Sequence, residues 1–160
     1  MIYLDYAATT PVDPHVLDAM LPYFSEAFGN PSSVHRYGQR AEAAVDAARE
    51  TVAAALHCQP DEIIFTSCGS ESDNLALHGV ALAMREQNGA NWIITTRDEH
   101  PAVSKTAEHL EKHYDFKVEW LDVDEHGMIL HQAIEKAICG STAIVSFMYA
   151  KNEIGTVNPV

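Results

Sequence analysis

Apolar positions in the first part of the chain follow the 3.6-residue period of α-helices. Asp13 supplies a helix cap and Pro14 stands at the first helical position, so a helix is predicted to begin there. Its apolar face consists of Val16, Leu17, Met20, Leu21 and Phe24. We expect Pro22 to kink this helix and Gly29 to end it. After a loop over 29–33, a longer helix is predicted from apolar residues at helical spacing, namely Ala41, Ala44, Val45, Ala48, Val52 and Leu56.

Short apolar runs predict four β-strands in the rest of the chain, at residues 62–65, 92–96, 116–121 and 143–148. Helical patterns separate them, at residues 74–85, 101–110 and 130–138. This alternation predicts an α/β fold with a predominantly parallel sheet and helices on both of its faces. The sequence contains no internal repeat, low-complexity segment or interdomain linker.

A polar stretch at residues 66–73, Thr-Ser-Cys-Gly-Ser-Glu-Ser-Asp, joins the first predicted strand to the next helix. The N-terminus of a helix offers unpaired N–H groups and the positive end of the helix dipole to an anion. Gly69 lets a ligand approach the backbone, and Ser70 offers both an N–H and a hydroxyl. The stretch therefore fits a phosphate-binding turn, and it equally fits an ordinary helix cap made by Ser70 or Ser72.

Two further polar loops follow predicted strands, one ending in His100 and the other containing Asn152. Ligands of open parallel sheets bind beyond the carboxyl ends of the strands, so we expect these loops and the turn at Gly69 to converge on one site. From the residues alone, His100 is more readily a helix cap or a surface histidine than a catalyst. Asn152 is equally explained as a turn residue that bonds nearby backbone.

The charge balance excludes some classes of partner. The 160 residues include 23 acidic residues against 10 Lys and Arg, for a formal net charge of −13, and 47% are hydrophobic, enough for a core. Nucleic acids and anionic membranes attract basic surfaces, so neither is an expected partner. Any anion must then be held by local backbone dipoles.

Several features point to the cytoplasm. No apolar run approaches the roughly 18 residues of a membrane span, and the first residues lack the basic region of a signal peptide. The three cysteines, Cys58, Cys68 and Cys139, are an odd number without CxxC spacing. We therefore expect neither a disulfide framework nor a metal site.

Five segments carry a family resemblance. They are Leu4–Pro11 (LDYAATTP), Gly29–His35 (GNPSSVH), Phe65–Asn74 (FTSCGSESDN), Glu99–Val103 (EHPAV) and Asn152–Val157 (NEIGTV). In this order and at this spacing they resemble the pyridoxal-phosphate-dependent cysteine desulfurases of the NifS and IscS type, members of the class V aminotransferase family. Five segments in register are far more specific than any single motif.

The resemblance covers the whole chain but only the N-terminal portion of such an enzyme. It implies an incomplete large domain of a fold-type I pyridoxal-phosphate-dependent transferase. Residues 1–12 would be an N-terminal arm and residues 13–160 the first part of the cofactor-binding domain, without its remainder or the C-terminal small domain. The end of the chain at residues 158–160, one loop after a strand, is likewise typical of an interrupted fold.

The same resemblance implies roles for the three loops. The turn at Gly69 and Ser70 would bind the phosphate of pyridoxal 5′-phosphate. His100 would stack on the pyridine ring and act as a catalytic residue that moves protons on the bound substrate. Asn152 would donate a hydrogen bond to the phenolic oxygen of the cofactor.

Three other residues depart from the family pattern or lack a defined role. Cys68 stands where many members have Gly, and we expect a small, partly buried side chain in a tight turn, not a sulfur carrier. Lys151 stands where many members have a second Asn, and we expect it to face solvent. His35 is either structural or lies on the substrate side.

The implied reaction converts L-cysteine to L-alanine and passes enzyme-bound persulfide sulfur to iron–sulfur cluster or thio-cofactor assembly. In the family, the Schiff-base lysine and the nucleophilic cysteine follow the segment that ends at Val157. None of the five lysines lies in a segment that resembles the Schiff-base motif, so we expect the chain alone to be inactive; they are Lys105, Lys112, Lys117, Lys136 and Lys151. The full-length enzyme is expected to be a homodimer with a sulfur acceptor such as an iron–sulfur scaffold protein.

Two other functions stay open at this point. One is a truncated, non-catalytic relative that binds phosphate compounds or a partner, if the gene product ends at Val160. The other is a pyridoxal-phosphate-dependent lyase acting on selenocysteine, which shares the early motifs.

Overall fold

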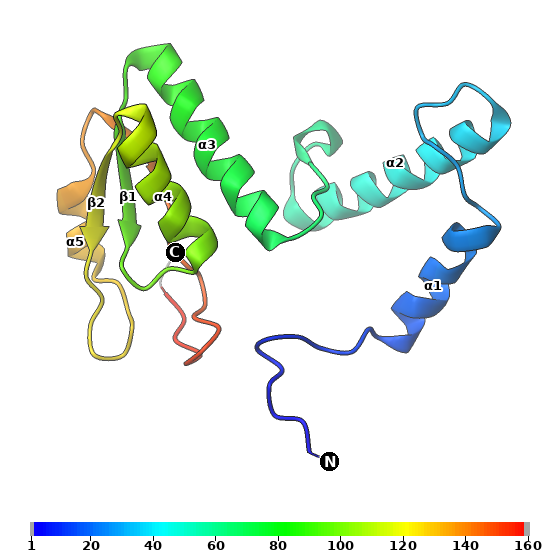
Figure 1. Ribbon diagram of the computed structural model, residues 1–160, viewed down its shortest axis with the longest axis horizontal. Coiled ribbons are helices and arrows are strands. Elements are labelled where there is room, and N and C mark those ends of the chain that lie inside the picture. Colours follow the sequence, from blue (N-terminus) through cyan, green and yellow to red (C-terminus); the bar gives the residue numbers. More distant parts are fainter. Residues whose placement is uncertain (1, 159–160) are drawn as a thin grey trace. The chain divides into compact units, whose positions relative to one another are not determined.

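The computed structural model describes residues 2–158 of the chain. It divides into two compact units, one from Met1 to Phe65 and the other from Thr66 to Val160 (Figure 1). The described part of the predicted arm, residues 2–12, forms neither helix nor strand. The last two residues, where the sequence indicates an interrupted fold, lie outside the described range.

The first unit contains helices α1 (Pro14–Ser25) and α2 (Arg36–Leu56) and a 3₁₀ turn, η1 (Pro60–Glu62). Asp13 caps α1 as predicted, because its carboxylate accepts a hydrogen bond from the His15 N–H at 2.8 Å. The helix contains Pro22 and ends at Ser25. The prediction that Gly29 ends it is therefore wrong.

Gly29 has a packing role instead. A β-carbon built on it would lie 2.4 Å from the carbonyl oxygen of Tyr37 in α2, so only glycine allows the loop this close approach. His35 caps α2, since its Nδ1 accepts a hydrogen bond from the Gly38 N–H at 3.3 Å. His35 therefore has a structural role, and the sequence allows this role beside one on the substrate side.

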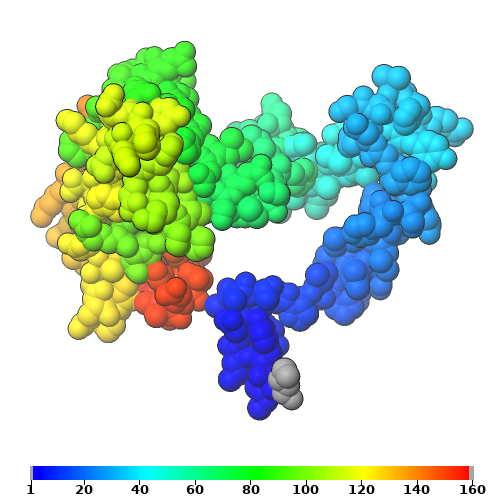
Figure 2. Space-filling model, viewed as in Figure 1, coloured from blue at the N-terminus to red at the C-terminus, as the bar shows by residue number. Residues whose placement is uncertain are grey.

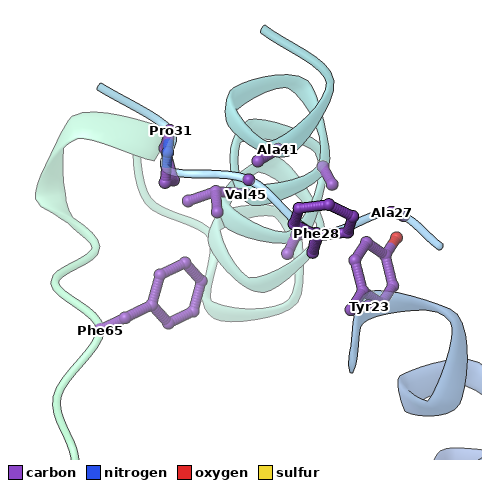
Figure 3. Close-up of a pocket in the computed structure, with 10 residues that line it drawn as sticks. Tyr23, Ala27, Phe28, Pro31, Ala41, Val45 and Phe65 are labelled. Carbon is purple, nitrogen blue, oxygen red and sulfur yellow. The ribbon is translucent and has the colours of Figure 1, made fainter. Parts of the chain in front are cut away.

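An open apolar hollow of about 590 Å³ lies beside α2 in the first unit. Figure 3 shows Tyr23 and Phe28 on one side of it and Phe65 on another, around the α2 side chains Ala41 and Val45. No described side chain of α1 is buried. The first unit therefore exposes much of the apolar face that the sequence pattern predicts as core.

The strand predicted at residues 62–65 is not formed, which corrects the sequence analysis. Ile63 has extended backbone angles, but no described segment pairs with it, and Ile64 and Phe65 are 68% and 51% exposed. A strand requires a neighbour because its N–H and C=O groups need partners. The apolar pattern predicts burial of side chains and carries no information about such a neighbour.

In the second unit three helices alternate with the three strands of one sheet, as the sequence predicts. In chain order they are α3 (Gly69–Asn88), β1 (Trp92–Thr96), α4 (Pro101–Tyr114), β2 (Lys117–Leu121), α5 (His131–Ala137) and β3 (Thr142–Val145). The three strands are parallel and lie in the order β2-β1-β3. These elements confirm the predicted α/β fold with a parallel sheet.

The strand order explains why helices cover both faces. The chain leaves β1 through α4 to reach β2 on one side, then returns through α5 to β3 on the other side. Because parallel crossovers are right-handed, the two opposite directions of travel place α4 and α5 on opposite faces. Figure 1 shows the strands between these two helices, with α3 beside α4.

The core of this unit lies between the sheet and the helices α3 and α4. It is built from fully or nearly fully buried apolar side chains, including Leu77, Ala81, Ile93, Ala107, Leu110 and Phe116. In the space-filling view this unit, coloured green to red, is a closely packed body (Figure 2). Among the described residues, no helix is both long and apolar enough to cross a membrane.

The last predicted strand, at residues 143–148, is shorter in the structure: β3 ends at Val145 and not at Met148. The Ser146 N–H still donates to the Ile94 carbonyl at 2.9 Å, but the Met148 N–H donates to the side chain of Glu99. A side chain thus replaces the strand ladder where β3 leaves the sheet.

Candidate functional site

A cavity of about 320 Å³ lies at the carboxyl ends of β1 and β3. Three segments contribute to it: α3 through Asp73, the loop from β1 into α4, and the segment after β3. Its wall consists of Asp73, Glu99, His100, Val103, Ser146, Phe147, Met148 and Asn152. The predicted site residues His100 and Asn152 therefore lie in one cavity, at the sheet edge where the fold places ligands.

Helix α3 begins at Gly69 and not near Asn74, so Gly69 and Ser70 belong to its first turn. The start is stabilised by Glu71, whose Oε2 accepts hydrogen bonds from the N–H and the hydroxyl of Ser67, both at 2.6 Å. This is a variant of the capping box, in which a glutamate of the first turn reaches back to the preceding backbone. The Ser-Cys-Gly-Ser-Glu sequence contains that signal.

Neither serine caps the helix, so the capping alternative for Ser70 and Ser72 is wrong. The N-cap residue is Cys68, and it makes no side-chain capping hydrogen bond. The Ser72 hydroxyl instead lies 2.5 Å from the Thr66 hydroxyl and bonds the Cys68 carbonyl at 3.3 Å. Among the described residues, no serine or threonine hydroxyl caps the first turn of α3.

Gly69 has free space around it. A β-carbon built on Gly69 meets no other atom within 4 Å, in contrast to Gly29 and Gly38 of the first unit. Packing within the described chain therefore does not require glycine at this position. Asp73, one helical turn further along α3, lines the cavity, whereas Gly69 and Ser70 do not.

Cys68 is exposed and not partly buried, which corrects the sequence expectation. The backbone N–H of Glu71, the Ser67 hydroxyl and the Ser70 N–H all point toward its sulfur, and they lower the pKa of the Cys68 thiol. A thiolate is favoured there because these donors stabilise its negative charge.

His100 is the N-cap of α4. Its Nδ1 accepts a hydrogen bond from the Ala102 N–H at 3.0 Å, and Pro101 occupies the first helical position. The capping role expected from the residues alone is confirmed. Because Nδ1 acts as the acceptor, the neutral ring carries its proton on Nε2.

Asn152 lies in the loop after β3, with an exposed side chain. Within residues 2–158 its side-chain amide makes no hydrogen bond, although the loop backbone is bonded between Lys151 and Thr156 at 2.8 Å. The alternative in which Asn152 satisfies nearby backbone is therefore wrong. The amide remains available to a ligand in the cavity.

Lys151 does not face solvent, contrary to the sequence expectation. Its side chain is 11% exposed, and Nζ lies 2.9 Å from Asp98 Oδ1 and 2.5 Å from the Asp98 carbonyl oxygen. The ion pair joins the loop after β3 to the loop after β1. These two contacts hold the Lys151 side chain against the loop after β1.

Two buried or half-buried polar residues of this region are absent from the sequence-based predictions. Asn158 is 5% exposed; its Oδ1 accepts from the Ile129 N–H at 3.0 Å and its Nδ2 donates to the Met148 carbonyl at 2.7 Å. Glu99 is half-buried beside His100, and burial raises its pKa. Glu99 is the first residue of the segment EHPAV and Asn158 directly follows NEIGTV, so only their polar character at these places could have indicated them.

No group of three His, Cys, Asp or Glu side chains in the described range is arranged to hold a metal ion. The polar groups that line the cavity are the imidazole of His100, the carboxylates of Asp73 and Glu99, the hydroxyl of Ser146 and the amide of Asn152. With the first-turn amides of α3 nearby along the same helix, the arrangement suits a ligand with an anionic group and a polar ring.

The chain is similar to proteins of one family over almost its whole length. The family model for aminotransferase class-V matches residues 2–160. A cysteine desulfurase IscS of Clostridium botulinum (strain Kyoto / Type A2) is 49% identical over 99% of this chain and 39% of its own length. A putative cysteine desulfurase IscS 1 of Bacillus subtilis (strain 168) is 46% identical over 99% of this chain and 41% of its own length.

Solved structures also superpose on almost the whole of this chain. A NIFS-like protein superposes with a TM-score of 0.89 at 41% identity, over 96% of this chain and 41% of that one. A structure titled "SspA in complex with cysteine" superposes with a TM-score of 0.88 at 39% identity, over 98% of this chain and 44% of that one. The chain spans about two fifths of the length of the curated relatives it matches.

Proposed function

Because the chain belongs to the aminotransferase class-V family, we propose that it forms the N-terminal part of a pyridoxal-phosphate-dependent cysteine desulfurase. The whole enzyme converts L-cysteine to L-alanine and holds the sulfur as a persulfide on an enzyme cysteine, for iron–sulfur cluster or thio-cofactor assembly. The support for this reaction is the name cysteine desulfurase carried by relatives at 46% and 49% identity.

The position of Gly69 at the start of α3, together with the free space around it, is the observation that carries the cofactor assignment. No atom of the described chain lies within 4 Å of a β-carbon built there, so internal packing does not explain the glycine. A phosphate at the first turn of α3 does explain it, because phosphate oxygens reach backbone N–H groups most closely where no side chain intervenes. Ser70 adds a second N–H and a hydroxyl. These residues therefore fit a phosphate group.

His100 and Asn152 fit the ring of the same cofactor. Both line the cavity, and the Asn152 amide has no hydrogen-bond partner within residues 2–158. In our proposal Asn152 donates to the phenolic oxygen and the His100 imidazole packs on the pyridine ring. With Nδ1 occupied by the Ala102 N–H, Nε2 is the atom of His100 that holds or moves a proton.

Pyridoxal 5′-phosphate, when bound, supplies the electron sink for chemistry at the substrate Cα. The chain's own residues do the binding and orienting. The first-turn amides of α3 would hold the phosphate, Asn152 would orient the ring, and His100 would hold or move a proton next to the ring. The side chains of Asp73 and Glu99 add two carboxyl groups to the wall of the cavity.

We further propose that this chain alone does not desulfurate cysteine, because none of its five lysines lies in a segment that resembles the Schiff-base motif. Lys151 is the one lysine beside the cavity loops, and Asp98 stabilises its charged ammonium. A nucleophilic lysine must instead be neutral, which requires a lowered pKa. Lys151 therefore serves the loop and not the cofactor.

The proposed partners follow from the same assignment. L-Cysteine is the substrate, and one structural neighbour carries cysteine in its title. The full-length enzyme would be a cytoplasmic homodimer that passes sulfur to an acceptor such as an iron–sulfur scaffold protein. The net charge of −13 gives no basic surface for nucleic acid.

A titration of the chain with pyridoxal 5′-phosphate tests the proposal. We expect saturable binding that inorganic phosphate displaces, with no adduct after borohydride treatment and no alanine formed from cysteine. Intact-mass and peptide analysis would locate any adduct. A borohydride-stable adduct on Lys151 would contradict the assignment of that residue, and the absence of any binding would contradict the cofactor site.

A further inference from the structure

The carboxylate of Glu99 joins the ends of two strands at the cavity. Its Oε1 accepts hydrogen bonds from the Met148 N–H at 2.7 Å and from the Thr96 hydroxyl at 3.3 Å. Thr96 is the last residue of β1, and Met148 lies in the segment that follows β3. One oxygen atom thus connects two segments far apart in the sequence; we call this set of contacts the Glu99 bridge.

The Glu99 bridge begins where the sheet ends. Up to Ser146, backbone groups of the β3 segment bond the backbone of β1. At Met148 the backbone N–H has no strand partner and bonds the Glu99 carboxylate instead. A half-buried N–H left without an acceptor costs free energy, so the carboxylate fixes the path of the chain at this point.

The Glu99 bridge joins the two segments that carry His100 and Asn152, the residues proposed to contact the cofactor ring. Glu99 precedes His100 in the chain, and Met148 leads into the loop that carries Asn152. All four line the same cavity. A movement of the Met148 segment away from Glu99 would therefore change the separation between the His100 ring and the Asn152 amide.

Several charged groups surround this carboxylate. Asp98 and His100 are its chain neighbours, the Asp73 carboxylate raises its pKa, and Lys151 lowers it. Burial is the largest effect and raises the pKa of Glu99. Partial burial of a carboxylate costs free energy, and the two hydrogen bonds of the Glu99 bridge offset part of that cost.

We propose that Glu99 is a positioning residue that holds the Met148 segment against the end of β1 and thereby sets the geometry between His100 and Asn152. The inference rests on the proposed function, since it concerns the ring end of the cofactor site. It does not involve the phosphate end, because neither Gly69 nor Ser70 contacts Glu99 or lines the cavity.

Three substitutions distinguish the effect of the two hydrogen bonds of the Glu99 bridge from the effect of the negative charge. In Glu99→Gln the amide oxygen can still accept from both donors, so the bridge is retained without the charge. In Glu99→Ala the acceptor for both donors is lost. Glu153→Ala is the matched control, because Glu153 is an exposed glutamate of the same loop as Asn152.

The experiment measures hydrogen exchange of the Met148 amide by NMR and the affinities for pyridoxal 5′-phosphate and for inorganic phosphate. For Glu99→Ala we expect exchange at Met148 to rise about tenfold and cofactor affinity to fall about fivefold, with phosphate affinity unchanged. Glu99→Gln and Glu153→Ala should match the original chain in all three. Rescue by Gln distinguishes positioning from a requirement for charge.

Two results would overturn the proposal. One is Met148 exchange in Glu99→Ala equal to that of Glu153→Ala. The other is an equal loss of cofactor and phosphate affinity, which would indicate general unfolding. If the original chain bound neither ligand, the proposed function would fail, and the exchange rate of Met148 would still decide whether the Glu99 bridge holds the segment.

Discussion

The Nζ atom of Lys151 lies 2.9 Å from Asp98 Oδ1, across the gap between two loops that leave neighbouring parallel strands. The lysine side chain is 11% exposed and the aspartate side chain 39%. The pair therefore links the loop after β3 to the loop after β1 in a partly desolvated setting. Its strength matters for the geometry of the cavity, because Asn152 follows Lys151 directly.

Replacement of Lys151 by Met should lower the free energy of unfolding of the second unit by about 1–2 kcal/mol. The substitution leaves the Asp98 carboxylate partly buried without its cation, and solvent at Asp98 limits the loss. Urea unfolding followed by tryptophan fluorescence measures this unit specifically, because both tryptophans, Trp92 and Trp120, lie in its sheet.

Lys105→Met is the control for this measurement. Lys105 pairs with Glu108 at 2.8 Å, but both side chains are more than half exposed. Its replacement should change the free energy of unfolding by less than about 0.5 kcal/mol. Equal effects of the two substitutions would show that the Lys151 pair contributes no more than a surface pair.

A pair of substitutions at His100 should separate capping from cofactor contact. His100→Ala removes the acceptor for the Ala102 N–H and should cost about 1 kcal/mol of stability. His100→Asn keeps a good N-cap but lacks the aromatic ring. Both variants should bind pyridoxal 5′-phosphate about fivefold more weakly, since ring stacking contributes about 1 kcal/mol. Full cofactor affinity in His100→Asn would exclude a contact by the ring.

The thiol of Cys68 should react with iodoacetamide at a lower pH than an ordinary cysteine. The Glu71 N–H, followed by the Ser67 hydroxyl, lowers its pKa, and a lowered pKa means that the reactive thiolate forms earlier as pH rises. Ser67→Ala removes the second of these donors, so the midpoint of the alkylation rate against pH should move upward.

Cys139 provides an internal reference in the same sample. Its pKa is also lowered, mainly by the Thr142 hydroxyl, which Ser67→Ala does not touch. Mass spectrometry of the two alkylated peptides should therefore show a shifted profile for Cys68 and an unshifted one for Cys139. Parallel shifts at both cysteines would argue against the local donors.

The sequence predicted those parts of the fold that depend on neighbouring residues. Asp13 and Pro14 mark the start of α1 because the cap and the first-turn proline act locally, and the apolar runs at β1 and β2 lie at the predicted positions. The run at Ile63 and Ile64 failed as a strand because pairing depends on a second segment. Local pattern cannot supply that information.

The same division applies to the site. His100 and Asn152 follow strands of a parallel sheet, so the topology alone brings them to one edge. The contact of Lys151 with Asp98 joins residues 53 positions apart in the chain. The hydrogen bond from Met148 to Glu99 joins residues 49 positions apart. Such contacts depend on the register of the strands and the exact course of two loops, neither of which is determined by residues near them.

The most direct test of a phosphate site at the first turn of α3 compares Gly69→Ala with Gly79→Ala in a titration with pyridoxal 5′-phosphate. Both glycines lie in α3 with free space for a β-carbon, so each alanine should leave stability unchanged or raise it by about 0.5–1 kcal/mol. If the first turn of α3 holds the phosphate, Gly69→Ala should weaken binding about tenfold or more, a loss of about 1.4 kcal/mol, while Gly79→Ala binds as the original chain does. Equal affinities of the two variants would contradict a phosphate site at Gly69.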